Sequence, residues 1–179
     1  MKSFLSIFNA RLMIIHFIAF WFFAYAFFTL AFLHDYGFLH LSSEHMLLLN
    51  DRGRFIKDKE FIRQSGNFGL LAAYIISWFI ASKHNWHWIN GVIIFVLGFT
   101  LYNLGYWGWN LVHGFFQEPS KLFKVNSVWG YLTDGLILLA IGLILLFSKG
   151  IIRYIDHSTA KDKQKAAANK KAVRTGKGK

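Results

Sequence analysis

The sequence predicts an all-α integral membrane protein with four transmembrane helices. Of its 179 residues, 55% are hydrophobic and 19% aromatic, and the apolar residues are gathered into four long runs. A water-soluble helix would instead place apolar residues on one face, with a period of about 3.6. The apolar content also excludes a chain that is disordered throughout, and the lack of Cys excludes a disulfide-stapled secreted domain.

Residues 12–33 are predicted to form the first transmembrane helix. A hydrocarbon core about 30 Å thick needs about 20 helical residues, and this aromatic-rich run has that length without a charge. Residues 1–11 form a short amphipathic stretch that is expected at the membrane interface. Ala24-Tyr25-Ala26 resembles a signal-peptide cleavage site, but the apolar residues continue to Leu33, which favours a retained helix.

Residues 34–66 are predicted to form an extracytoplasmic loop. Two short apolar stretches flank Asn50-Asp51-Arg52-Gly53, which favours a hairpin in which Gly53 supplies a positive φ. A pair of short helices is the alternative. The loop either offers a docking point for a periplasmic partner or simply caps the bundle.

The other three transmembrane helices are predicted at residues 67–83, 88–112 and 128–148, with a second extracytoplasmic loop at 113–127. The first of these is short, and Lys83 can extend its reach by snorkelling to the interface. The next carries Trp88, Trp107 and Trp109 near its ends, where aromatic rings settle at the headgroups. Four crossings place both termini on one side.

The distribution of basic residues predicts which side this is. Thirteen of the 20 Lys and Arg residues fall on the side of the termini and seven on the other. Cytoplasmic segments carry the excess of Lys and Arg, so both termini are predicted to be cytoplasmic. The lysine-rich tail and compact loops favour a bacterial inner membrane.

Residues 149–179 are predicted to form a basic cytoplasmic tail that is disordered, with a loose helix as the alternative, because its last stretch contains almost nothing to bury. Lys149 and Arg153, next to the last helix, are expected to contact anionic lipid headgroups. Binding to nucleic acid is the alternative, but the basic residues lack the interleaved aromatic residues that would favour it, so no nucleic acid is expected.

A polar face runs along the predicted third helix. Asn103, Tyr106, Asn110 and His113 recur at intervals of three and four residues, which places them on one side of a helix. Polar side chains in hydrocarbon require partners, so this face is expected to point into the bundle, towards another subunit or towards water. It forms either interhelical hydrogen bonds or a polar path or ligand site.

Glycine stripes predict which helices pack closely. Gly91, Gly98 and Gly105 recur every seven residues in the third helix, and Gly135 and Gly142 do so in the fourth. Small residues let helix backbones approach in a membrane. The third and fourth helices are therefore predicted to pack tightly against each other.

Asp134 is the only acidic residue inside a predicted helix. An ionisable residue in a membrane is by default a candidate functional residue. Three interpretations remain open: a hydrated carboxylate at the outer headgroups, a bond to the third helix, or a proton carrier.

Eight histidines raise the question of a metal or haem. His34, His40, Glu44 and His45, with Asp35, crowd the outer end of the first helix, but their spacing matches no compact metal site, and none is predicted. His16 and His113 fall near opposite ends of their helices, too far apart to share a haem iron. A haem near His16, with His84 and His87, remains the low-ranked alternative to a protein without cofactor.

The leading hypothesis is a noncatalytic subunit that stabilises or regulates a larger membrane protein complex. The chain has no Cys nucleophile, phosphate-binding glycine loop or paired acidic residues within a predicted helix, and no small-molecule substrate can be identified. The expected partners are the lipid bilayer and other membrane subunits. The alternative is a proton- or electron-conducting subunit of an energy-coupling complex.

Overall fold

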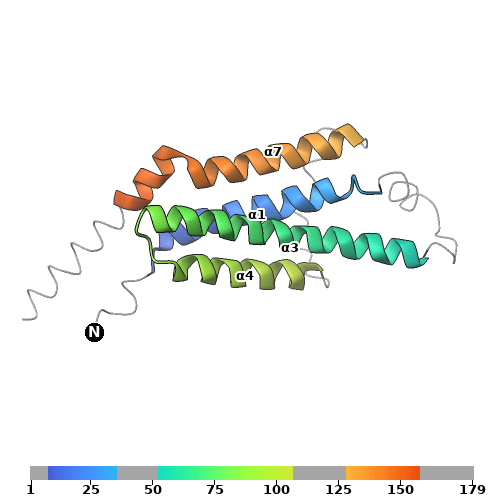
Figure 1. The fold of residues 1–179 in the computed structure, drawn as a ribbon, viewed down its shortest axis with the longest axis horizontal. Helices are drawn as coiled ribbons and strands as arrows, with labels where there is room; N and C mark the ends of the chain where they lie inside the picture. The colour runs from blue at the N-terminus through green and yellow to red at the C-terminus, as the bar shows by residue number, and fades with distance from the viewer. Residues whose placement is uncertain (1–7, 36–51, 107–127, 158–179) are drawn as a thin grey trace, which may run out of the picture.

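The computed structural model describes residues 8–35, 52–106 and 128–157. Four long helices dominate this part of the chain: α1 (Ala10–Ala31), α3 (Arg52–Lys83), α4 (Ile89–Tyr106) and α7 (Val128–Phe147). They lie side by side in an elongated bundle (Figure 1). The described residues contain no strand, so the predicted all-helical class is confirmed.

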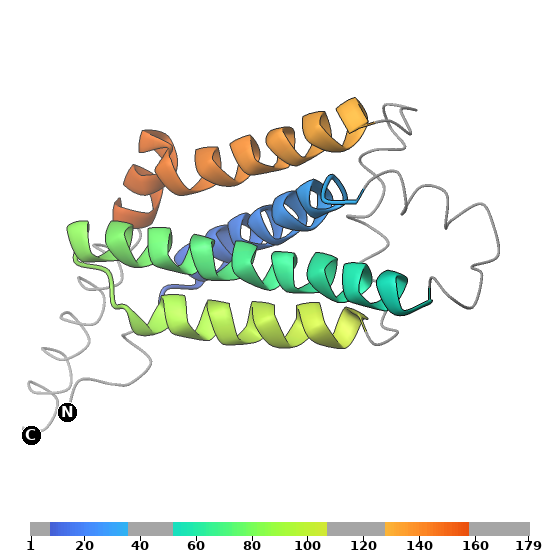
Figure 2. The same ribbon diagram turned by 45° about the vertical axis from the view of Figure 1, so that its right-hand side comes forward.

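α1 is the central helix. It packs against α3, α4 and α7, whereas α4 and α7 lie on opposite flanks of the bundle (Figures 1 and 2). Small and aromatic residues alternate irregularly along α1, and many of both kinds are fully buried, including Ala19, Phe20, Ala24 and Tyr25. The small residues let neighbouring helices approach α1 closely, and the aromatic rings fill the space between the helices.

Aromatic rings form a nearly continuous column along α1. Phe17, Trp21, Tyr25, Phe28 and Phe32 follow each other at three or four residues, with centroids of successive rings 5.4–5.9 Å apart. These distances are typical of aromatic pairs. The column is a consequence of helical spacing in an aromatic-rich segment.

Three helices are long and apolar enough to cross a bilayer: Ala10–Ala31, Gly53–Lys83 and Val128–Phe147. The apolar part of α4, Ile89–Leu104, is shorter. In α3, the charged residues before Lys83 all lie at or before Arg63, so only the second half of this helix is suited to hydrocarbon. These helices place the chain in a lipid bilayer environment, with three candidate crossings where the sequence predicted four.

The loop predicted at residues 34–66 is helical from Arg52 onward. Gly53 belongs to the first turn of α3 and lacks the positive φ expected of a hairpin glycine. Hydrogen bonds from Arg63 and Gln64 to Glu60, three and four residues earlier, support the helix on its polar side. The predicted hairpin turn is therefore wrong at Gly53, and residues 36–51 lie outside the described residues.

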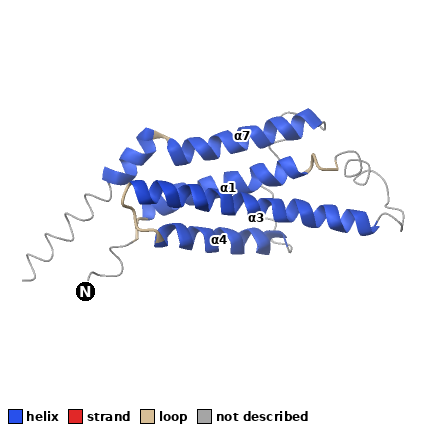
Figure 3. Ribbon diagram, in the orientation of Figure 1, coloured by secondary structure: helices blue, strands red, loops and turns tan. Residues whose placement is uncertain are grey.

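The predicted tail begins with a second short helix. After a break at Ser148, residues 149–157 are helical and turn away from the α7 axis (Figure 3). Ile155 in this segment is fully buried. The prediction of disorder is therefore wrong for residues 149–157, because Ile151, Ile152 and Ile155 give it an apolar side that packs against the core.

The glycine stripes contact α1 and α3, and the predicted pairing of the last two long helices is wrong. A Cβ at Gly135 would lie 2.5 Å from Leu30, and one at Gly142 would lie 2.7 Å from Phe23, both in α1. Gly91 and Gly98 face α3. Small residues indicate that two helices approach closely but do not specify the partner, which is α1 for the stripe of α7 and α3 for the described part of the stripe of α4. The surroundings of Gly105 lie outside the described side chains.

Candidate functional site

Asn103 joins α4 to α3 through hydrogen bonds. Its Nδ2 donates to Oδ1 of Asn67 at 3.0 Å, and its Oδ1 accepts from Nη1 of Arg63 at 2.7 Å. The tyrosine hydroxyl of Tyr102 donates to the backbone oxygen of Arg63 at 3.3 Å. Asn103 therefore forms interhelical hydrogen bonds, which is one of the two interpretations that the sequence leaves open for the polar face. The side chain of Tyr106, and Asn110 and His113, lie outside the described residues.

The loop end of the bundle, where α1 ends and α3 begins, carries a carboxyl pair. Asp35 accepts a hydrogen bond from Nε of Arg54 at 2.7 Å and forms an ion pair with the same guanidinium. Asp58, one turn further along α3, is only 8% exposed, and its Oδ2 has no hydrogen-bond partner among the described residues. Burial raises the pKa of Asp58 above its ordinary value of 3.8, and the charge and hydrogen bond of Asp35 raise it further, against the opposing charges of Arg54 and His34.

Asp58→Asn is expected to remove a pH-dependent loss of stability. Because its pKa is raised on folding, Asp58 contributes stability below pH 3.8, and this contribution is lost as the pH rises through the folded pKa. The variant cannot ionise at this position, so its free energy of unfolding should decline less than that of the parent above pH 3.8. Thermal unfolding in detergent, followed by tryptophan fluorescence across this range, measures the difference.

Glu60→Gln is the matched control, with the opposite sign. Hydrogen bonds from Arg63 and Gln64 lower the pKa of the exposed Glu60 to about 2 from its ordinary value of 4.5. Its contribution to stability is therefore present above pH 4.5 and is lost as the pH falls towards 2. Identical pH profiles for Asp58→Asn and the parent would contradict the assignment to Asp58.

The potential metal ligands at the loop end do not gather into a metal-binding group in the part of the chain that is described. No group of three potential metal-ligating side chains occurs there. The imidazole of His34 instead packs on Phe61, with ring centroids 4.5 Å apart. His40, Glu44 and His45, which the sequence groups with His34 and Asp35, lie outside the described residues.

Asp134 is buried between α7 and α1. It is 2% exposed, and neither carboxyl oxygen has a hydrogen-bond partner among the described residues. The next residue, Gly135, lies against Leu30 and the backbone of Ala26. This burial contradicts the expectation of a hydrated carboxylate, because α7 turns Asp134 towards α1. An ionised carboxylate here would lose several kcal/mol of hydration without compensation.

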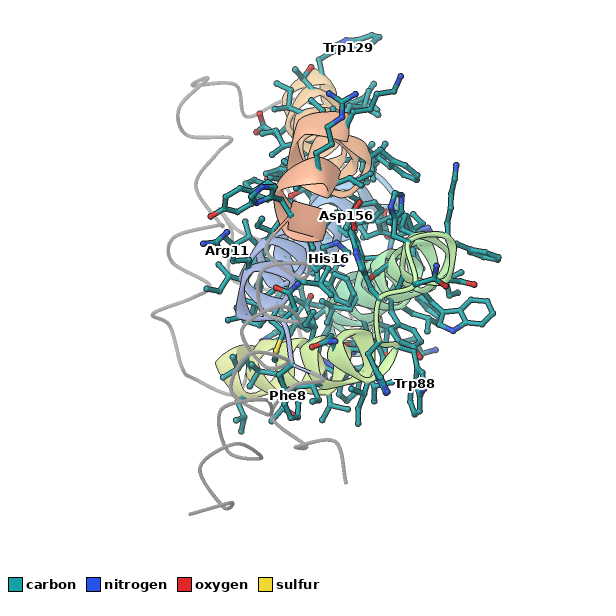
Figure 4. The ribbon with its side chains drawn as sticks, turned by 90° about the vertical axis from the view of Figure 1, so that its left-hand side faces the viewer. Phe8, Arg11, His16, Trp88, Trp129 and Asp156 are labelled. Atoms are coloured by element: carbon teal, nitrogen blue, oxygen red, sulfur yellow. The ribbon has the colours of Figure 1, made fainter. Side chains whose placement is uncertain are left out.

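The opposite end of the bundle holds a second polar cluster. We call it the turn end: it comprises the start of α1, the α3–α4 turn at residues 84–88 and the helix at residues 149–157 (Figure 4). Nδ1 of the buried His16 lies 2.8 Å from Oγ of Ser77, which joins α1 to α3. Asn90 at the start of α4 accepts a hydrogen bond from the backbone of Asn9 at 3.1 Å.

Asp156 binds the α3–α4 turn from the helix at residues 149–157. Its Oδ1 accepts from Nε1 of Trp86 at 2.7 Å, and its Oδ2 lies 3.2 Å from Nδ1 of His84. Asn85 adopts a left-handed conformation, φ 54°, which lets the turn reverse direction between these two residues. The turn end therefore links all four long helices: His16 joins α1 to α3, Asn90 joins α4 to the start of α1, and Asp156 joins the segment after α7 to the α3–α4 turn.

Two of the three histidines considered for haem meet at Trp86. The indole contacts His16 at 5.8 Å and His84 at 5.1 Å between ring centroids. His87 instead accepts from the backbone nitrogen of Ile89 at the start of α4. The Nδ1 atoms of His16 and His84 are both used in bonds between segments of the protein, so the cluster as described holds segments together.

Sequence reasoning missed Asp156, Trp86 and Ser77. None has a motif, and each depends on a contact between segments 61 to 72 residues apart. The usable signal was the spacing of Ile151, Ile152 and Ile155 beyond the last apolar run, which indicates an amphipathic helix that returns to the bundle.

Comparison with known proteins gives one partial similarity. The chain is 31% identical over 101 residues to a probable hexose phosphate transport protein of Chlamydia pneumoniae, a match covering 45% of this chain and 22% of that protein. The chain thus spans only about a fifth of the length of this relative. No family model matches the sequence, and no solved structure matches the fold.

Proposed function

We propose that this protein is a noncatalytic integral membrane subunit that stabilises or regulates a larger membrane protein complex. The observation that carries the proposal is the one-sided packing of α7. Its buried residues form a stripe against α1: Gly130, Asp134, Gly135, Leu138, Gly142 and Leu146. Its other sides carry exposed aliphatic residues, Leu136, Ile137, Leu143 and Ile144.

This outer surface of α7 suits a helix from another subunit. Leu136 and Leu143, like Ile137 and Ile144, are seven residues apart, about two helical turns, so they lie on one side of α7 where a neighbouring helix can pack, and dispersion between such surfaces drives association in a membrane. The polar side chains inside the bundle support the same function. His16 bonds to Ser77 and Asn103 to Asn67, so these groups hold helices in place.

A photocrosslinking experiment with a matched control tests the proposal. A photoreactive residue replaces Ile144 in α7 or Phe79 in α3, both 62% exposed. Each tagged variant is expressed at its natural level in its own host, irradiated, and purified in mild detergent. We expect position 144 to crosslink a stoichiometric membrane protein, identified by mass spectrometry, and position 79 to crosslink mainly lipid.

Two results would overturn the proposal. If the protein purifies alone, or only with copies of itself, it is not a subunit of a larger complex. If positions 144 and 79 crosslink a partner equally, α7 is not the specific contact surface.

The proposed setting is a bacterial inner membrane with both termini in the cytoplasm. The support is the excess of Lys and Arg on the side of the termini, thirteen of 20. The start of α1 and the helix at residues 149–157 also meet at one end of the bundle, where Arg11 lies over the ring of Tyr154. In this orientation the turn end is cytoplasmic.

The second candidate function is proton conduction within an energy-coupling complex, and Asp134 favours it. A buried carboxyl group without a hydrogen-bond partner among the described residues is the type of side chain that carries protons across membranes. The similarity to a transport protein covers 22% of that protein's length. Of the two candidate functions, only proton conduction is a form of transport. Loss of proton flux in reconstituted Asp134→Asn protein is the result that the candidate requires.

A further inference from the structure

Exposed cations without carboxylate partners gather at the turn end. Lys83, Lys149 and Arg153 are exposed there, and within the described residues none forms an ion pair. At the loop end, by contrast, Arg54 pairs with Asp35 and Arg63 with Glu60. Lys57 and Lys59 are also exposed at the loop end, but Asp35, Asp58 and Glu60 offset the cations there, whereas Asp156 is the one acidic residue that the structure describes at the turn end.

The helix at residues 149–157 holds two of these cations in fixed positions. Lys149 and Arg153 are four residues apart, so they lie on the same face of this helix. Ile155 anchors the opposite side in the core, and Asp156 is bound by Trp86 and His84. The cationic face is thus presented by a docked segment.

We propose that Lys149 and Arg153, with Lys83, form a binding surface for the headgroups of anionic phospholipids. The surface begins directly after the apolar α7, and the end of a helix that crosses the hydrocarbon core lies next to the headgroups. Trp88 and Tyr154, 56% and 52% exposed, lie at the same end and provide the aromatic rings that settle at this level. Basic residues next to a membrane helix are attracted to anionic lipids, and the docked helix adds a fixed geometry to that attraction.

Lipid titration followed by native mass spectrometry tests the proposal on the full chain. The purified protein in detergent is mixed with phosphatidylglycerol, which is anionic, or with phosphatidylcholine, which has no net charge. The parent should bind phosphatidylglycerol in preference. Removing both cations in Lys149→Gln/Arg153→Gln should weaken that binding, by about fivefold for each cation, and leave phosphatidylcholine binding unchanged.

Lys57→Gln/Lys59→Gln is the matched control. It removes the same charge from exposed residues of α3 at the other end of the bundle, and it should bind both lipids as the parent does. Equal binding of the two lipids by the parent, or equal loss in the two double variants, would overturn the proposal.

Asp156→Ala separates a positioned surface from a simple charge effect. The variant gains one positive charge, which by charge alone would strengthen the binding of phosphatidylglycerol. It also removes both acceptors that dock the helix at residues 149–157, so we expect weaker binding. Stronger binding than in the parent would overturn the docked geometry. Circular dichroism that matches the parent shows that the four long helices are retained.

Discussion

Replacing Gly69 by alanine is expected to disrupt the contact between α1 and α3 and to lower the free energy of unfolding by about 3 kcal/mol. A Cβ at this position would lie 2.4 Å from the backbone oxygen of Phe23, 2.8 Å from its carbonyl carbon and 3.0 Å from Cα of Ala24. No side-chain rotation relieves a contact with backbone, so the two helices must move apart. The loss therefore lies near the upper end of what overpacking normally costs.

The measurement is thermal unfolding in detergent, followed by the fluorescence of the seven tryptophans. Gly53→Ala is the control in the same helix, since a Cβ there meets nothing within 4 Å. Alanine is the better helix former, so this variant should gain up to about 1 kcal/mol. Similar changes in both variants would mean that α1 and α3 do not approach at Gly69.

The apolar runs of the sequence predict α1 and α7 well, and α4 begins one residue after the predicted position 88, whereas residues 107–112 of that prediction lie outside the described residues. α3 illustrates a limit. α1 and α7 begin and end within two residues of the predicted boundaries. α3 starts fifteen residues before the predicted position 67, because its first half is polar. Hydropathy detects the part of a helix that suits hydrocarbon, whereas the backbone hydrogen bonds continue wherever charged side chains can reach water.

The pairing of helices was harder to predict than their positions. The stripes at Gly135 and Gly142 identify a closely packed side of α7, but the sequence does not state that α1 lies there. The matching glycine stripes suggested that the third and fourth predicted helices are neighbours, as consecutive elements often are. The central position of the aromatic α1 overrides this tendency, since its bulky side chains contact every other helix.

Among the polar residues, too, some could be predicted from the sequence and others could not. Asn103 stands out in the sequence because it interrupts an apolar run, and its bonds to α3 follow from the need of a half-buried amide beside apolar side chains for partners. Asp156 and Trp86 lie in polar surroundings in the sequence, and only the returning helix at residues 149–157 brings them together. Residues that matter through tertiary contact alone leave no local signal.

Asp134→Val is expected to stabilise the protein by about 2 kcal/mol. The carboxyl group is 2% exposed and lacks hydrogen-bond partners among the described residues. Its loss of hydration on folding is therefore not offset by hydrogen bonds within the protein. Thr133→Val is the matched control, because Thr133 is the exposed neighbour and valine has nearly its shape. That variant should change the free energy of unfolding by less than about 0.5 kcal/mol. A large destabilisation by Asp134→Val alone would instead reveal a partner for the carboxyl group.

The isosteric Asp134→Asn variant connects this stability to function. Asparagine has the size of aspartate but cannot take up and release a proton at the carboxyl oxygens. If Asp134 carries protons, the variant should keep the fold and lose proton flux across reconstituted vesicles, while Thr133→Val keeps it. Unchanged flux would exclude Asp134 as the proton carrier. Asp134 would then cost the fold stability without serving a proton path, because its stripe of α7 faces α1 and a subunit on the outer surface of α7 cannot reach the carboxyl group.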